Sequence, residues 1–258
     1  MSSIEIRDDG AVRVVTLNRP DVRNALSAAL RSELLSALHE ADAEASVRVI
    51  VVTGTGAAFC AGLDLRELEA TVTGSEADHR ADSAALAELF LAVVESPKPV
   101  VAAVNGAAVA GGAGLVTACD VAFAARSARF GYTEARIGFV AALVSVLLVR
   151  QVGDKHAREL LLGAGLVSAE RALAMGLVNE VVDDGAALER AMEFARTVSR
   201  NAPGSLAATK GLLRDVGSLG LRQGFEAALE VNVASRSGAE LAEGVRAFLE
   251  KREPAWRA

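Results

Sequence analysis

The sequence predicts an α/β fold, and three observations support that prediction. The β-branched runs at 47–52 and 100–104 are typical of strands buried on both faces by helices. Before the first of these runs, leucines recur at every fourth position from Leu26 to Leu38, which predicts an amphipathic helix. Beyond Gly153 the pattern becomes mainly helical, so an alternation of strands and helices is followed by a helical tail.

The remaining elements follow in chain order. Short runs at 4–6 and 12–17, separated by Asp9-Gly10, predict a β-hairpin with a tight turn. The polar stretch 66–83 is expected to be mobile, and a helix that ends at Pro97 follows it.

Two further features complete the expected core. The run at 121–124 predicts a third buried strand. Ser168 and Gly176 fit the N-cap and C-cap of a later helix.

Composition limits the function classes. The chain has 258 residues, 52% of them hydrophobic, and 27 basic against 33 acidic side chains give a net charge of −6. This excludes a disordered chain and argues against nucleic acid or an anionic membrane as the main partner. Cys60 and Cys119 form no disulfide framework, and the three histidines lie far apart, so no metal site is expected. With no apolar run long enough to span a membrane, the sequence predicts a soluble cytoplasmic protein.

Two loops that follow buried strands are candidates for chemistry. The loop at 54–64 resembles the start of a dinucleotide fingerprint, but Phe59 occupies the third glycine position, so that interpretation fails. The loop at 105–114 contains almost only small residues before an expected helix. Backbone N–H groups at a helix start can hold an oxyanion, although small residues serve tight helix–sheet packing equally well.

Several ordered motifs resemble the crotonase (enoyl-CoA hydratase/isomerase) superfamily, and together they cover essentially the whole chain. They are NRP at 18–20, RNAL at 23–26, AFCAGLDL at 58–65, NGAAVAGGAGLVTACD at 105–120, FGYTEARIG at 130–138, ALAMGLVN at 172–179 and EGVRAF at 243–248.

The resemblance implies a fold and an assembly. Residues 1–200 are expected to form a spiral core of ββα units, and residues 201–258 a C-terminal helical oligomerisation region. Members usually form trimers or pairs of trimers, so a homotrimer or homohexamer is expected.

The resemblance also implies a site for an acyl-CoA thioester. Two backbone N–H groups, at positions matching Leu63 and Gly111, polarise the thioester carbonyl. No separate cofactor is implied, because coenzyme A is part of the substrate. The positions expected to contact it are Arg23, Ala25, Ala61, Leu63, Asp64, Leu65 and Gly111, with Phe248 and Lys251 from the C-terminal region.

The acid/base residues depart from the usual family pattern. Typical hydratases carry one glutamate three residues after the oxyanion glycine and a second about twenty residues later. Here Glu134 matches the second, whereas Gly114 occupies the first position. This combination is most similar to bacterial single-glutamate hydratases of the methylglutaconyl-CoA type.

Three functions remain open from the sequence. The favoured one is hydration of an α,β-unsaturated acyl-CoA, with Glu134 as the principal acid/base group. The first alternative is a Δ3,Δ2-enoyl-CoA isomerase, because one carboxylate can move a proton along an enoyl chain. The second is a non-catalytic acyl-CoA-binding or assembly subunit, in which Gly114 marks lost chemistry.

Overall fold

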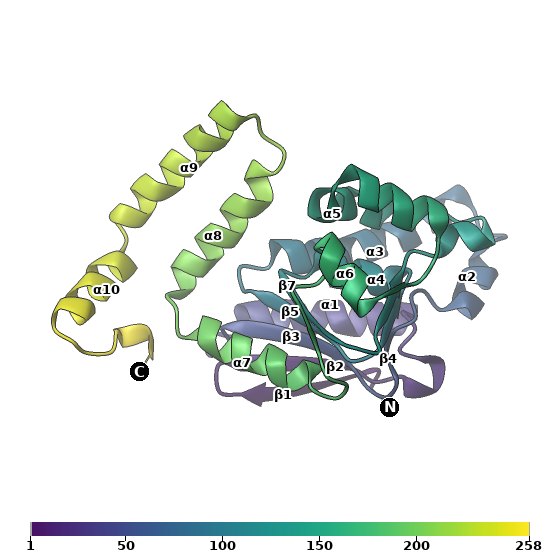
Figure 1. Cartoon of the computed structure of the whole chain (residues 1–258), viewed down its shortest axis with the longest axis horizontal. Helices are drawn as coiled ribbons and strands as arrows, with labels where there is room; N and C mark the ends of the chain where they lie inside the picture. Colours follow the sequence, from purple (N-terminus) through teal and green to yellow (C-terminus); the bar gives the residue numbers. More distant parts are fainter. Residues whose placement is uncertain (1, 258) are drawn as a thin grey trace.

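Two β-sheets organise the first part of the chain in the computed structural model, which describes residues 2–257 (Figure 1). The larger sheet has six strands in the order β1-β2-β3-β5-β7-β10, and the smaller has four in the order β4-β6-β8-β9. The larger sheet comprises β1 (Ile4–Asp9), β2 (Val12–Leu17), β3 (Val49–Gly54), β5 (Val100–Val104), β7 (Val121–Ala125) and β10 (Glu180–Val182). The smaller comprises β4 (Ala58–Cys60), β6 (Ala107–Val109), β8 (Arg129–Gly131) and β9 (Val167–Ser168).

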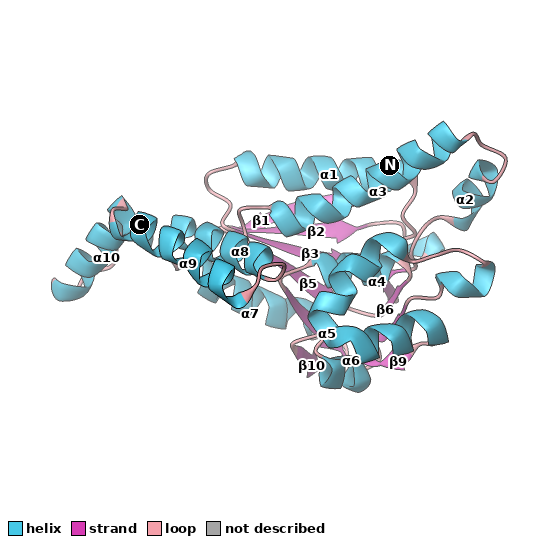
Figure 2. Ribbon diagram, turned by 90° about the horizontal axis from the view of Figure 1, so that it is seen from above, coloured by secondary structure: helices cyan, strands magenta, loops and turns pink. Residues whose placement is uncertain are grey.

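Within residues 2–257, ten α-helices surround these sheets and continue beyond them (Figure 2). They are α1 (Ala28–Ala43), α2 (Leu65–Thr71), α3 (Glu76–Glu95), α4 (Gly111–Ala118), α5 (Ala142–Gly163), α6 (Ala169–Met175), α7 (Ala187–Ser199), α8 (Pro203–Val216), α9 (Leu221–Arg236) and α10 (Ala239–Leu249). Short 3-10 turns lie at Pro20–Val22, Glu134–Ile137 and Ala255–Arg257.

The chain repeats a ββα path three times. β3, β5 and β7 each enter the larger sheet, and the next strand along the chain, β4, β6 or β8, joins the smaller sheet. A helix then follows each pair. The expected spiral of ββα units is therefore confirmed, and each passage from one sheet to the other brings a loop to the same side of the core.

Alternation along the buried strands separates two apolar layers. Val49 and Val51 of β3 face one side, where they pack with Met192 of α7. Ile50 and Val52 face the opposite side and join the main core with α1 and α3. Because neighbouring side chains point to opposite faces, a continuous apolar run is what a strand covered on both faces requires.

Three local expectations are corrected by the structure. The stretch 66–83 is mostly helical apart from the turn at 72–75, because Asp64 caps α2 and a Ser75–Asp78 capping box starts α3. The hairpin turn lies at Gly10-Ala11, since Asp9 still pairs with Val12. The loop 105–114 contains a short strand, β6, before the helix begins.

The C-terminal helices extend away from the sheets (Figure 1). Neither α8 nor α9 has a buried residue in the chain described. The apolar side chains spaced along α9 are exposed, with Leu221 at 82% and Phe225 at 71%. None of the helices within residues 2–257 is both long enough and apolar enough to span a membrane.

One partly buried lysine, Lys210, fastens α8 to the core. Lys210 pairs with Asp120 at 2.8 Å and also donates to the carbonyl oxygens of Val93 and Lys98. Asp120 accepts a further bond from the N–H of Val100 at 2.7 Å. Burial raises the pKa of Asp120, while Lys210 opposes that shift. Asp120 therefore has a structural role, joining α8 to the start of β5.

Candidate active site

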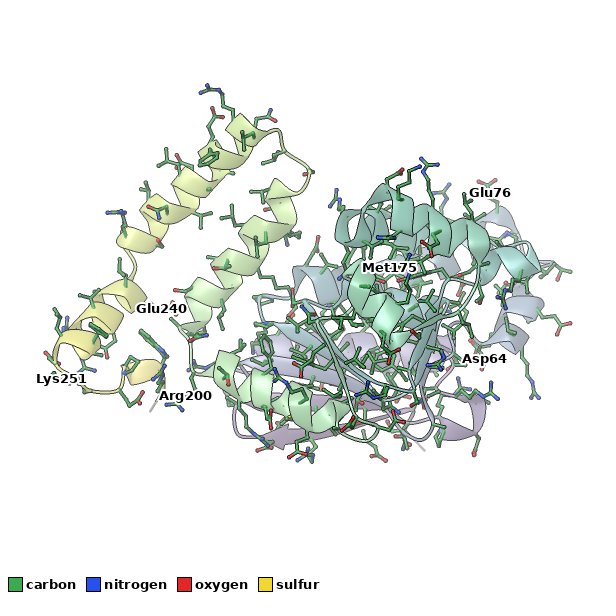
Figure 3. The ribbon with its side chains drawn as sticks, viewed as in Figure 1. Asp64, Glu76, Met175, Arg200, Glu240 and Lys251 are labelled. Carbon is green, nitrogen blue, oxygen red and sulfur yellow. The ribbon has the colours of Figure 1, made fainter. Side chains whose placement is uncertain are left out.

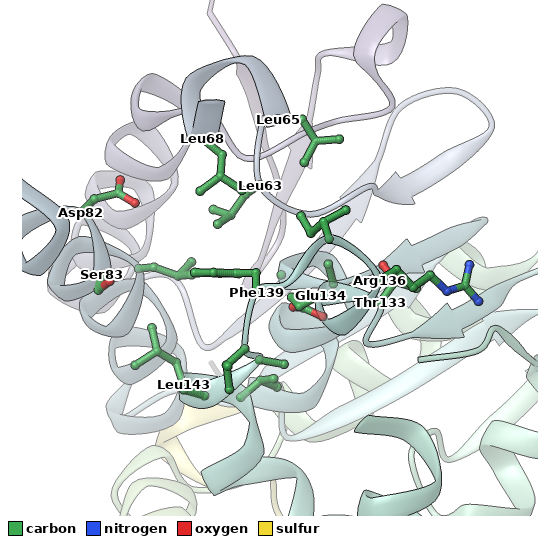
Figure 4. Close-up of a pocket in the computed structure, with 18 of the residues that line it drawn as sticks. Leu63, Leu65, Leu68, Asp82, Ser83, Thr133, Glu134, Arg136, Phe139 and Leu143 are labelled. Carbon is green, nitrogen blue, oxygen red and sulfur yellow. The ribbon is translucent and has the colours of Figure 1, made fainter. Parts of the chain in front are cut away.

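A cavity of about 580 Å³ lies between α3, the start of α4 and the segment 133–144 (Figure 4). Most of its lining is apolar, contributed by residues such as Leu63, Leu86 and Phe139. A few polar side chains project into it, among them Asp82 and Glu134. A large apolar cavity with few polar groups is typical of a small-molecule site.

The turn after β4 presents a backbone N–H to this cavity. Leu26 donates to the carbonyl oxygen of Gly62 at 2.8 Å and accepts from the N–H of Asp64 at 3.3 Å. Leu26 and Leu63 form a parallel bridge, and both of its bonds use the residues on either side of Leu63. The N–H of Leu63 itself therefore points away from Leu26. This N–H donates to no acceptor within the described chain.

The start of α4 presents a second N–H. Ala110 turns the chain with φ 50° and ψ −123°, a strained conformation for a residue with a side chain, and its N–H is bonded to the carbonyl oxygen of Gly131 at 2.7 Å. Gly111 then begins the helix, where N–H groups have no intrahelical acceptor. Its N–H has no acceptor among residues 2–257.

The two N–H groups are neighbours because their loops touch. A Cβ added at Gly111 would lie 3.7 Å from the nitrogen of Leu63. A Cβ added at Gly62, where φ is +90°, would approach the Cβ of Ala110 to 2.8 Å and the nitrogen of Gly111 to 3.1 Å. Glycine is therefore required at this contact, and the pair of N–H groups forms a candidate oxyanion hole.

Glu134 supplies an acid/base group to the same cavity. It opens the 3-10 turn Glu134–Ile137, and its Oε2 is buried with no hydrogen-bond partner in the described chain. Burial raises the pKa of this carboxyl above its ordinary value. A carboxyl in an apolar cavity with a raised pKa is suited to proton transfer near neutral pH.

A buried hydrogen bond couples Glu134 to the oxyanion helix. The hydroxyl groups of Tyr132 and Thr117 lie 2.6 Å apart, and Thr117 also donates to the carbonyl oxygen of Ala113 in α4. Tyr132 is two residues before Glu134, so this contact fixes the acid/base segment against the helix of Gly111. Sequence reasoning missed this pair, since only the fold brings it together.

Another side chain occupies the space beside Gly114, the position at which typical family hydratases carry a glutamate. A Cβ added at Gly114 would lie 2.7 Å from Cζ of Phe90 and 3.4 Å from Cγ2 of Val144. Phe90 belongs to α3 and is 4% exposed. An aromatic ring therefore fills the space that a side chain at position 114 would need.

The structure brings half of the ten residues expected at the site into one cavity. Its lining includes Ala61, Leu63, Leu65, Gly111 and Glu134.

Three expected contact residues lie beside the cavity rather than in its lining. Arg23 is exposed with φ 52°, and Ala25 is buried on the same segment. Asp64 caps α2 and pairs with Arg19 at 3.1 Å, a structural task that sequence reasoning had not assigned.

Phe248 and Lys251 do not approach the cavity within one chain. Figure 3 shows Lys251 on the C-terminal extension and Asp64 on the opposite side of the molecule. Phe248 is 83% exposed at the end of α10.

Asn24 is a second structural residue missed from the sequence. It is completely buried, and its side-chain amide donates to the carbonyl oxygens of Ala58 and Phe59 at 2.9 and 3.2 Å. Its Oδ1 accepts from the N–H of Arg19 at 2.8 Å. These bonds join the segment before α1 to β4 and so support the turn that carries Leu63.

A charged pair lies at the α3 side of the cavity. Arg31 of α1 is 7% exposed and pairs with the carboxylate of Asp82, which lines the cavity. In Figure 4, Asp82 and Ser83 lie away from Glu134, on the helix opposite it. Within residues 2–257, no group of three or more metal-ligating side chains is gathered.

Comparison with known proteins gives one consistent result. The family model described as enoyl-CoA hydratase/isomerase matches residues 7–258. A Thermus thermophilus protein provisionally named as an enoyl-CoA hydratase is 51% identical over 248 residues, covering 96% of this chain and 98% of that protein. The 2,3-dehydroadipyl-CoA hydratase of Escherichia coli is 34% identical, covering 98% of both chains.

Solved structures agree with these sequence matches. An enoyl-CoA hydratase from Mycobacterium smegmatis superposes with a TM-score of 0.93 at 34% identity, covering 100% of both chains. One from Polaromonas gives a TM-score of 0.92 at 34% identity, covering 97% of this chain and 98% of that one. The similarity therefore includes the C-terminal helices as well as the two sheets.

Proposed function

Because this chain belongs to the enoyl-CoA hydratase/isomerase family, we propose that it adds water to an α,β-unsaturated acyl-CoA thioester with Glu134 as its only acid/base carboxylate. The names of the relatives favour hydratase over isomerase. The observation that carries the residue assignment is that Leu63, Gly111 and Glu134 line one apolar cavity.

The two N–H groups are assigned to the thioester oxygen. As a nucleophile adds to C3, negative charge moves through C2 and C1 onto this oxygen. The N–H groups of Leu63 and Gly111 would hold the resulting enolate, and they need little rearrangement because their loops are already in contact. Removing one such donor typically costs about 10²–10³ in rate.

Glu134 is assigned both proton transfers. Its carboxylate takes a proton from water as the water oxygen bonds to C3. The resulting carboxylic acid then gives that proton to C2, which collapses the enolate and restores the carboxylate. The net change is addition of one water, and a raised pKa favours a group that must both accept and donate near neutral pH.

Glycine at position 114, which leaves Glu134 without the second glutamate of the usual family pattern, favours isomerisation as a second candidate. A base that removes a proton from C2 of a 3-enoyl thioester and returns it to C4 would need no water and no second acid. Retention of Glu134 in the cavity argues against the third candidate, a subunit that only binds acyl-CoA.

The path of coenzyme A belongs to this proposal. Ala61 and Leu65 would line the thiol end, while Arg23, Ala25 and Asp64 would lie on the segment followed by the remaining part. The exposed apolar face of α9 supports a homotrimer or homohexamer, in which Phe248 and Lys251 of a neighbouring copy would complete the site. We place this activity in the cytoplasm, with coenzyme A entering as part of the substrate and no separate cofactor.

Product analysis tests the reaction. The purified protein is incubated separately with crotonyl-CoA and with a 3-enoyl-CoA, and the products are separated and weighed by mass spectrometry. We expect crotonyl-CoA to gain the mass of one water and the 3-enoyl ester to change little. Double-bond migration without a gain of water would support the isomerase, and no change in either ester would overturn both enzymatic candidates.

A further inference from the structure

We propose that Phe90 is a specificity-determining residue whose ring limits substituents on the acyl carbon next to the thioester. This inference rests on the proposed function, because it assumes that an acyl thioester occupies the cavity. It concerns a residue on α3, a helix that contributes neither the oxyanion hole nor the acid/base group.

The position of the ring is defined by the packing of α3 against α4. Phe90 lines the cavity, and its Cζ and Cε2 lie 2.7 and 3.3 Å from where a Cβ on Gly114 would be. Leu89 and Val93 of α3 are buried in the main core, so the helix that carries the ring is held firmly. The ring therefore forms a fixed part of the cavity wall.

This part of the wall is next to the reacting carbons. Gly114 lies three residues after Gly111, and residues with this spacing share one face of a helix at about 5–6 Å separation. A thioester oxygen at the N–H of Gly111 places C1 and C2 within about one helical turn of that residue. C2 would accordingly lie between the ring of Phe90 and the carboxylate of Glu134.

The chemistry of the ring determines what it can select. A phenyl ring offers no hydrogen bond to water, so it can position the acyl chain only by contact. A methyl group on C2 that points away from Glu134 would point toward the ring. Since interiors are close-packed, that methyl group would need space that the ring already fills. The site should prefer unbranched C2 atoms.

Leu86 provides a matched control within the same helix. It lies four residues before Phe90 on the same face of α3 and also lines the cavity. Unlike Phe90, it contributes none of the three atoms nearest to the position of a Cβ on Gly114. Shortening Leu86 should therefore enlarge the cavity without opening the space beside C2.

The experiment measures binding of non-reacting esters, so it does not depend on turnover. Affinities for butyryl-CoA and 2-methylbutyryl-CoA are measured by calorimetry for the wild type, Phe90→Ala and Leu86→Ala. We expect Phe90→Ala to shift the affinity ratio about tenfold toward the branched ester, the discrimination typical of one methylene-sized group. Leu86→Ala should leave the ratio within about twofold of the wild type.

A ratio unchanged in Phe90→Ala, or shifted equally by Leu86→Ala, would overturn the proposal. If Phe90→Ala does not fold, Phe90→Leu keeps an apolar side chain on α3 while removing the ring, and the same ratio is measured. Wild-type protein that binds neither ester would also overturn it. By contrast, wild-type protein that binds both esters but hydrates no enoyl-CoA would contradict the proposed function while the binding ratio still decides the role of Phe90.

Discussion

One wall of the cavity is formed by backbone groups and another by side chains. The backbone wall consists of Gly62, Leu63, Ala110 and Gly111, which contribute N–H groups and close contacts between loops. The side-chain wall consists of Phe90 and Glu134, which contribute a ring and a carboxyl.

This difference separates two chemical tasks. The backbone wall is restricted by sterics, since an added Cβ at Gly62 would meet neighbouring atoms at 2.8 Å. The task proposed for this wall is polarisation of the thioester oxygen. The side-chain wall depends on which residue occupies a position, so a carboxylate can be replaced by glycine and a ring without disturbing the backbone. Family chemistry can thus change on the second wall while the first is kept.

The largest expected effect is on the side-chain wall. Glu134→Gln keeps the size of the side chain but removes proton transfer, so kcat should fall by about 10²–10⁴ with little change in affinity for butyryl-CoA. Steady-state kinetics and calorimetry measure the two quantities. Glu69→Gln is the matched control, because this exposed glutamate of α2 lies outside the cavity lining. Equal rates for Glu134→Gln and wild type would remove Glu134 from the mechanism.

A methyl group on the backbone wall should have the next largest effect. In Gly111→Ala the new Cβ would lie 3.7 Å from the nitrogen of Leu63 and 3.3 Å from Cδ1 of Leu26, contacts that the fold can accept with a small adjustment. The methyl group would block the oxyanion hole, so kcat/KM should fall by about 10²–10³. Gly163→Ala, where an added Cβ meets no atom within 4 Å, controls for the loss of a helical glycine. Normal kinetics in folded Gly111→Ala would show that this contact serves packing alone.

Restoring a carboxylate at position 114 should primarily affect stability. Gly114→Glu forces its Cβ against the ring of Phe90, so the free energy of unfolding should fall by about 1–3 kcal/mol. Urea denaturation measures this loss, and Phe90→Ala/Gly114→Glu should lose less than the sum of its single changes. Gly163→Glu, in open space, should be close to neutral. Strict additivity in the double variant would contradict the proposed contact.

The smallest effect concerns pH and stability. Burial raises the pKa of Glu134, so the folded protein retains this proton to higher pH than the unfolded chain does. Ionisation of Glu134 therefore destabilises the fold as pH rises. Glutamine cannot ionise, so Glu134→Gln avoids this loss of stability. Its free energy of unfolding relative to wild type should not rise below the ordinary carboxyl pKa of about 4.3, and the full rise should be present above the raised pKa. Thermal unfolding at several pH values measures the trend, and a gain confined to acidic pH would have the wrong sign.

The backbone wall could be predicted from the sequence far better than the side-chain wall. The motifs at 58–65 and 105–120 that resemble the crotonase superfamily pointed to Leu63 and Gly111, whereas the small residues at 105–114 alone fitted tight packing equally well. Phe90 could not be found in this way. It lies 24 positions before Gly114 on another helix, and only the packing of α3 on α4 brings the two together.

The helix at 65–71 and the part of the helix at 76–95 that precedes residue 84 show a different failure. Their polar composition suggested a mobile stretch, yet Asp64 and the Ser75–Asp78 pair are cap signals that the sequence displayed. The prediction for residues 66–83 gave more weight to their polar composition than to these capping signals. By contrast, the buried strands were predicted well because β-branched runs report burial on both faces.

In this assignment, the backbone wall polarises the thioester while Glu134 on the side-chain wall transfers protons. Measuring the polarisation of a bound enoyl thioester tests this assignment most directly. Difference absorbance is recorded for an enoyl-CoA bound to Glu134→Gln, which should hold the ligand without turning it over, and to Glu134→Gln/Gly111→Ala. Hydrogen bonds to the carbonyl oxygen pull electron density along the conjugated chain and shift its absorbance to longer wavelength. We predict that the shift persists in Glu134→Gln and is lost in the double variant. The same shift in both would contradict the assignment of polarisation to the N–H groups of Leu63 and Gly111.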